Sequence, residues 1–194
     1  MRTYLAGLVF LFIIPGSFAQ SVKNNTHYSV QKTITCGKGA VVSAHPLASM
    51  AGLQILKQGG NAVDAAIATQ LALAVVYPAA GNIGGGGFMV AHLSNGQNIS
   101  IDYREKAPAK ASRDMYLDKD GNAQLDLSQY GHLASGVPGT VAGLFASLKY
   151  AKLPFVKLIQ PAIDLAEHGF PITAGQAASF NSNKKEFLEQ NKAA

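Results

Sequence analysis

The chain has 194 residues, of which 48% are hydrophobic and only 14% charged, which suits one medium domain or a piece of a larger one. The 16 Lys and Arg residues against 11 Asp and Glu give a net charge of +5, but the basic residues are scattered, which argues against a nucleic-acid-binding surface. Cys36 is the single cysteine, so an internal disulfide is excluded.

Residues 1–19 have the pattern of a signal peptide. Arg2 supplies a positive charge, residues 5–14 form an apolar run, and small residues lead to a cleavage point after Ala19. The apolar run is shorter than the roughly 20 residues that a membrane-spanning helix needs. We therefore expect an exported protein, periplasmic or secreted, with no membrane span after signal cleavage.

The region that follows, residues 20–38, is polar and is predicted to be a loosely held lead-in. Asn24 and Asn98 each begin an N-glycosylation sequon, which matters only in a host that glycosylates.

The remainder of the chain alternates between strand and helix patterns. Helical spacing of apolar residues predicts helices at residues 46–58, 62–77, 138–151, 155–168 and 173–192. Short apolar runs predict strands at residues 40–44, 88–93 and 99–105. Asn95-Gly96 between the last two predicts a hairpin, and Asn61 with Asp64 three residues later predicts a helix N-cap. Residues 107–132 are predicted to be irregular, so the class is mixed α/β.

The glycine run at residues 84–87 does not fit a phosphate-binding loop. Such a loop follows a strand and opens a helix, whereas here a helix precedes the glycines and a strand follows them. We expect instead that bare backbone passes close to another segment here, or adopts positive φ.

Arg104 is the candidate binding residue, at the end of the strand predicted for residues 99–105. A guanidinium can hold a carboxylate with two parallel hydrogen bonds, and a strand end is a rigid place for it. On these facts alone, a surface or structural salt bridge is the stronger interpretation. We expect structural roles for four histidines that show no ligand spacing: His45, His92, His132 and His168.

Five strings in one order resemble the large subunit of the γ-glutamyltranspeptidases (glutathione hydrolases). They are GGNAVDAAIATQLALAVVYP, GNIGGGGFMV, DYREKAPAKASRDMYLD, ASGVPGTVAGL and PAIDLAEHGFPIT. The resemblance runs over residues 39–173, so residues 39–194 are expected to be the N-terminal part of that subunit and an incomplete domain.

The resemblance implies an N-terminal-nucleophile hydrolase, an αββα sandwich of which only an N-terminal portion is present. A precursor of this family cuts itself into a large and a small subunit. The new N-terminal Thr of the small subunit attacks the γ-glutamyl amide of glutathione, and an ester intermediate passes the γ-glutamyl group to water or to an amino acid or peptide. No cofactor and no metal are implied.

The resemblance also assigns residues within the string DYREKAP. Arg104 matches the arginine that holds the α-carboxylate of the γ-glutamyl group, which raises the binding interpretation over the salt bridge. Glu105 follows it in the motif and is expected to orient it.

Thr26 begins the string Thr-His-Tyr-Ser-Val, which is similar to the motif around the family's nucleophilic Thr. In the family that motif lies far downstream, whereas Thr26 stands seven residues past the expected signal cleavage. A second cut after Asn25 would be needed to free its amine as the general base. We therefore expect the likeness to be accidental and the nucleophile to lie beyond residue 194.

The 194 residues alone are accordingly expected to be inactive, with the activity belonging to the full precursor. Three alternatives stay open: a cephalosporin acylase of the same fold, a non-catalytic exported module that keeps the γ-glutamyl grip, and a structural fragment without function.

Overall fold

The computed structural model describes residue 33 and residues 35–190. The chain separates into two units, Met1–Thr35 and Cys36–Ala194, and all of the described helices and strands belong to the second. The expected signal peptide, Thr26 and the sequon at Asn24 lie outside the described residues. Asn98, of the other sequon, is exposed at the start of a strand.

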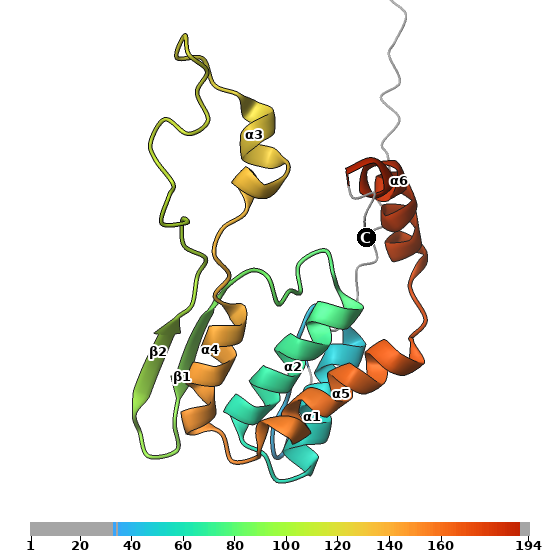
Figure 1. Cartoon of the computed structure of the whole chain (residues 1–194). Coiled ribbons are helices and arrows are strands. Elements are labelled where there is room, and N and C mark those ends of the chain that lie inside the picture. The colour runs from blue at the N-terminus through green and yellow to red at the C-terminus, as the bar shows by residue number, and fades with distance from the viewer. Residues whose placement is uncertain (1–32, 34, 191–194) are drawn as a thin grey trace, which may run out of the picture. The chain divides into compact units, whose positions relative to one another are not determined.

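Three helices form the main body, with α2 at its centre (Figure 1). They are α1 (Pro46–Lys57), α2 (Ala62–Val76) and α5 (Phe155–His168). Because α2 is apolar nearly all round, it packs against α1 on one side and α5 on another, as its sequence predicts. The apolar core includes the fully buried Ile55, Ile67, Val76 and Leu158.

The start of α2 is held by a network around Asp64, which is completely buried. The side chain of Asn61 accepts hydrogen bonds from the backbone of residues 63 and 64, while Asp64 accepts one from the Asn61 backbone at 2.7 Å. Asp64 also accepts from the backbone N–H groups of Lys152, at 3.0 Å, and Leu153, at 3.0 Å. The cap predicted from the sequence is confirmed, and it additionally ties α2 to the turn before α5.

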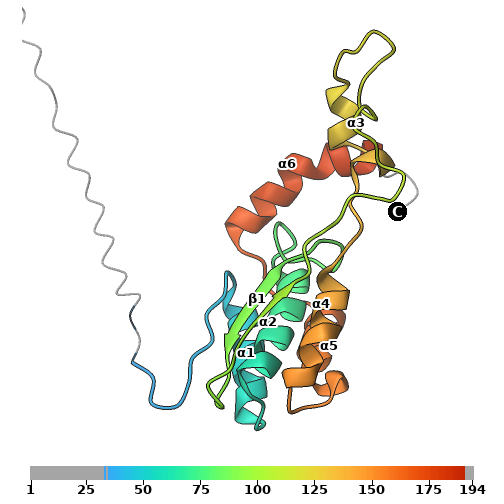
Figure 2. The ribbon, with the colours of Figure 1, turned by 90° about the vertical axis from the view of Figure 1, so that its left-hand side faces the viewer.

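A hairpin of β1 (Phe88–His92) and β2 (Asn98–Asp102) lies beside the helices (Figure 2). The strands are antiparallel, with Phe88 opposite Asp102. Gly96 has a φ of 83° in the connecting turn, a conformation that favours glycine, so the predicted hairpin is confirmed. Met89 packs against the helical core, and β2 contacts α4 (Thr140–Ser147).

The chain between β2 and α4 makes a long excursion over residues 107–136. It contains α3 (Leu125–Gln129) and a 3₁₀ turn, η1 (His132–Ala134). Lys106 and Val137 exchange two backbone hydrogen bonds, at 3.2 and 2.8 Å, and so close the excursion at its base.

Two elements complete the described chain. A 3₁₀ turn, η2 (Leu148–Tyr150), continues α4, and α6 (Ala174–Gln190) follows α5. Thr173 and Gln176 exchange side-chain to backbone hydrogen bonds at the start of α6, and Gln176 also donates to the carbonyl of Val76 at 2.8 Å. Among these described helices, none has both the length and the hydropathy to cross a membrane.

Several predicted elements differ from the structure. The strand predicted at residues 40–44 is wrong: no described segment pairs with it, and Val42 is 90% exposed. The helix predicted at residues 138–151 starts later, at Thr140 with Gly139 as its N-cap residue, and its last turn is 3₁₀.

The strand predicted at residues 99–105 also ends early, at Asp102. The side chain of Asp102 accepts a hydrogen bond from the N–H of Arg104, which turns the backbone, and the pairing passes to Val137 at Lys106. The irregular segment predicted at residues 107–132 contains the short helix α3.

Asp64→Asn should lower the free energy of unfolding by about 2–4 kcal/mol, because the amide places an NH₂ group where backbone N–H donors point. Chemical unfolding of the chain followed by circular dichroism measures this change. Asp164→Asn, at an exposed position on α5, is the matched control and should change the free energy by less than about 0.5 kcal/mol. Equal losses in the two variants would contradict the role given to Asp64.

Candidate functional site

Arg104 lies between two anchored backbone segments. On one side, the N–H of Arg104 donates to the Oδ1 of Asp102 at 3.0 Å. On the other, Lys106 pairs with Val137. The Arg104 side chain is exposed, and no described residue forms an ion pair or hydrogen bond with its guanidinium. The backbone of Arg104 is therefore anchored on both sides, while its guanidinium is exposed and its donors are available to a ligand.

Tyr103 fixes the backbone on which Arg104 stands, because glycines approach it from two sides. A Cβ atom at Gly86 would lie 2.6 Å from the carbonyl oxygen of Tyr103, and one at Gly87 would lie 2.8 Å from its ring. Gly139 and Gly143, at the start of α4, press against the Tyr103 carbonyl and ring in the same way. Neither side has room for a side chain.

This contact explains the glycine run at residues 84–87. None of these four glycines has positive φ, whereas Gly86 and Gly87 both touch the segment that carries Arg104. Of the two expected reasons for the run, close approach of backbone is confirmed and positive φ is not. The run leads into β1, and its backbone packs against residues 103–105.

The hydroxyl of Tyr103 is half-buried between α2 and β1. It donates to the Oε1 of Gln70 at 3.2 Å and lies 3.4 Å from the carbonyl oxygen of Phe88. Burial raises the pKa of Tyr103 above its ordinary value of 10.0, and the hydrogen bond with Gln70 partly opposes that rise. The neutral phenol is therefore the form that the fold stabilises.

A hollow of about 560 Å³ opens beside these residues, between the end of β2 and α4. Its charged lining residues are Asp102, Arg104, Glu105 and Lys106, and its apolar floor comes mainly from Val137 and the small residues of α4. Arg104 and Glu105 form no ion pair with each other, so the orienting role of Glu105 stays a prediction. The hollow combines apolar walls with a guanidinium, which suits a small ligand that carries a carboxylate.

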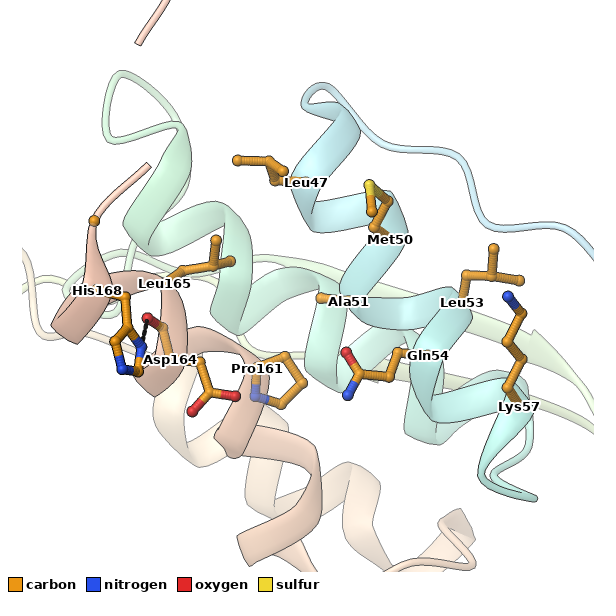
Figure 3. Close-up of a pocket in the computed structure, with 11 residues that line it drawn as sticks. Leu47, Met50, Ala51, Leu53, Gln54, Lys57, Pro161, Asp164, Leu165 and His168 are labelled. Atoms are coloured by element: carbon orange, nitrogen blue, oxygen red, sulfur yellow. Dashed lines mark hydrogen bonds between the residues drawn. The ribbon is translucent and has the colours of Figure 1, made fainter. Parts of the chain in front are cut away.

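A second hollow, of about 530 Å³, lies between α1 and α5 (Figure 3). Leu47, Met50 and Leu53 enter it from α1, and Pro161 and Leu165 from α5. The His168 ring at its edge bonds to the backbone carbonyl of Asp164 at 2.9 Å and so stays on its own helix. This apolar groove brings no set of polar groups to one point, and Arg104 is not among its lining residues.

The other candidate residues take no part in a described site. His45 caps α1 by accepting from Leu47, and His92 bonds to Asn98 across the hairpin, which agrees with structural roles for both. Cys36 is exposed. In the part of the chain that the structure describes, no three His, Cys, Asp or Glu side chains come close enough to hold a metal ion.

Sequence patterns alone did not indicate some residues of the site. These are Tyr103 together with Gly139 and Gly143, which lie four residues apart on one face at the start of α4. That spacing of small residues was the available signal, because it marks a helix face that another segment can approach closely.

The fold is that of a known class. The family model described as gamma-glutamyltranspeptidase matches residues 48–194. The chain therefore belongs to the gamma-glutamyltranspeptidase family. Its similarity to solved gamma-glutamyltranspeptidases and to a cephalosporin acylase supports the N-terminal-nucleophile hydrolase fold expected from the sequence.

Individual relatives agree with this assignment. The chain is 49% identical to a glutathione hydrolase proenzyme from a Pseudomonas species over 84% of its own length and 28% of that relative's. The crystal structure of Helicobacter pylori gamma-glutamyltranspeptidase superposes with a TM-score of 0.78 at 52% identity, covering 82% of this chain and 46% of that one. An acylase proenzyme from another Pseudomonas strain is 43% identical over 74% of this chain and 27% of the relative. The chain thus spans less than a third of the length of the curated relatives it matches.

Gly86→Ala should lower the free energy of unfolding by about 1–3 kcal/mol, because the new methyl group overlaps the backbone of Tyr103 and Glu105. Chemical unfolding measures the loss. Gly84→Ala is the matched control: it lies in the same glycine run, nothing stands within 4 Å of its added Cβ, and its effect should stay within about 0.5 kcal/mol. An unchanged free energy of unfolding in Gly86→Ala would show that the close contact between the glycine run and residues 103–105 is not needed for stability.

Alkaline pH should destabilise the fold through Tyr103. Its folded pKa lies above the ordinary value of 10.0, so its contribution is fully present below pH 10 and is lost as the pH rises through the folded pKa. The free energy of unfolding, measured from about pH 8 to pH 11, should therefore fall less steeply in Tyr103→Phe than in the wild type. Identical slopes would rule out this linkage; the other six tyrosines are unchanged between the two proteins.

Proposed function

We propose that this chain supplies the substrate-carboxylate grip of an enzyme that cleaves the γ-glutamyl amide of glutathione. The enzyme passes the γ-glutamyl group to water, an amino acid or a peptide. The observation that carries the proposal is the Arg104 guanidinium, exposed in a hollow, unpaired among the described residues and fixed at its backbone by Tyr103 and Lys106. Membership of the gamma-glutamyltranspeptidase family and relatives named glutathione hydrolase proenzyme support it.

The role of Arg104 follows from the chemistry of the donor. In a γ-glutamyl group, the reacting carbonyl and the α-carboxylate lie at opposite ends of a short, flexible chain. Two parallel hydrogen bonds from a guanidinium hold the carboxylate end in position and orientation. With that end fixed, a nucleophile placed a constant distance away meets the carbonyl in a productive geometry.

The nucleophile in this proposal is a threonine at the N-terminus of the small subunit, cut from the same precursor. The support for it is the family resemblance, together with relatives that are named proenzymes. Arg104 and the hollow beside it would then face that subunit. No metal or cofactor enters the proposed reaction.

An acylase of the same fold is the second candidate, because relatives with that name match at 43% identity in sequence and 30% in structure. A glutaryl amide presents a carboxylate to the same guanidinium but lacks the α-amino group. Rates of anilide release from L-γ-glutamyl and glutaryl substrates separate the two: the main proposal requires a strong preference for the γ-glutamyl compound.

Export to the periplasm or the outside of the cell is part of the proposal. Its support is the sequence of residues 1–19, with a basic start, an apolar run and small residues before the cleavage point. N-terminal sequencing of the mature protein tests it, with Gln20 as the expected first residue.

Arg104→Lys should raise the KM for L-γ-glutamyl-p-nitroanilide by about 10- to 100-fold, because a lysine cannot reproduce the two parallel hydrogen bonds. The measurement is steady-state anilide release by the gene product at its natural length. Arg113→Lys is the matched control, since Arg113 is almost fully exposed and pairs only with Asp114 among the described residues. An unchanged KM in Arg104→Lys would refute the grip.

A further inference from the structure

The side chain of Asn82 joins the glycine run to the helix on the other side of Tyr103. Its Oδ1 accepts a hydrogen bond from the N–H of Gly85 at 2.8 Å and a second from the hydroxyl of Thr140 at 2.7 Å. Its Nδ2 donates to the carbonyl of Ala80 at 3.1 Å. One amide therefore shapes the turn before β1 and connects that turn to α4, 58 residues away.

Backbone hydrogen bonds reinforce this connection. The carbonyl of Gly85 accepts from the N–H groups of Gly139, at 2.8 Å, and Thr140, at 3.0 Å. Thr140 is completely buried, and its hydroxyl is the only side-chain group among the described residues that bonds α4 to this turn. The link is thus short and partly buried, and it has a single side-chain contact that can be removed.

The segment that carries Arg104 lies between the two linked elements. A Cβ at Gly86 would lie 2.6 Å from the carbonyl oxygen of Tyr103 and 2.7 Å from the N–H nitrogen of Glu105. From the side of α4, a Cβ at Gly139 would lie 3.2 Å from the carbonyl oxygen of Arg104 itself. A change in the separation of the glycine run and α4 must therefore move residues 103–105.

We infer that Asn82 and Thr140 are positioning residues for substrate binding and act through Arg104. Their hydrogen bond, together with the two backbone hydrogen bonds to Gly85, sets the spacing between the glycine run and the first turn of α4. That spacing fixes the backbone at Arg104, and so fixes where the guanidinium meets a carboxylate. The inference rests on the proposed function, in which Arg104 holds the α-carboxylate of the donor.

A role in stability alone makes a different prediction. Loss of a buried hydrogen bond lowers the fraction of folded enzyme, which reduces the rate with every substrate by the same factor. Loss of position weakens only the interaction that depends on that position. A donor that lacks the α-carboxylate therefore distinguishes the two roles.

The experiment compares three variants of the gene product at its natural length. Thr140→Val removes the hydroxyl and keeps the shape, whereas Thr140→Ser keeps the hydroxyl. Ser147→Ala is the matched control, because it removes another fully buried hydroxyl of α4, whose hydrogen bond at 2.7 Å goes to the carbonyl of Gly143 on the same helix. The donors are L-γ-glutamyl-p-nitroanilide and 4-aminobutyryl-p-nitroanilide, which is the same molecule without the α-carboxylate.

Thr140→Val should raise the KM for the γ-glutamyl donor by about three- to tenfold and leave its kcat within about twofold of the wild type. The KM for the 4-aminobutyryl donor should not change. Thr140→Ser and Ser147→Ala should keep the wild-type KM for both donors. Equal losses with the two donors, or no change in Thr140→Val, would overturn the inference.

A second measurement keeps the inference separate from the proposed function. If Arg104→Lys leaves the KM unchanged, the carboxylate grip fails, and amide hydrogen exchange of the same full-length gene product then tests the positioning role. Exchange at residues 103–106 should be faster in Thr140→Val than in Thr140→Ser, while exchange within α2 stays the same. Equal exchange at residues 103–106 in the two variants would overturn the positioning role.

Discussion

The structure around the candidate site depends on the close packing of Tyr103 between two glycine-containing segments. Its backbone lies against Gly86 and Gly139, and its ring against Gly87 and Gly143. Because the atoms of Tyr103 are in close contact with glycines on both sides, Tyr103 has little room to move. An arginine next to such a residue has a flexible side chain on a backbone that is held in place. That combination suits a cation that has to meet a small ligand at one place.

Tyr103 is in turn anchored by a hydrogen bond to α2, the helix at the centre of the body. Gln70 on α2 accepts a hydrogen bond from the Tyr103 hydroxyl. At the start of α2, Asp64 accepts hydrogen bonds from the turn before α5, and at its end the carbonyl of Val76 accepts one from Gln176. A buried carboxylate that accepts several backbone hydrogen bonds is stable only when all its donors are in place. The helix is therefore held by hydrogen bonds at both ends and in its middle, and both the hairpin and α4 are positioned against it.

The local signals in the sequence predicted most of the helices, the hairpin and the cap at Asn61, because periodicity, Asn-Gly and a capping box act within a few residues. The strand at residues 40–44 failed for the complementary reason: a strand depends on a distant partner, and no described segment bonds to it. Arg104 was predicted as a binding residue from its place at a strand end and from its motif, and that role stays a prediction. Its support from Asn82 and Thr140 joins residues far apart in the chain, which no local pattern reveals.

The pairing at the base of the excursion over residues 107–136 separates the length of this segment from the geometry of the site. Because Lys106 and Val137 pair directly, the ends of this segment meet whatever lies between them. The entropy of closing a flexible loop grows only with the logarithm of its length, so doubling the segment costs about 0.6 kcal/mol. The length of the segment can therefore change at a small cost in stability, while the backbone beside its base keeps its pairing.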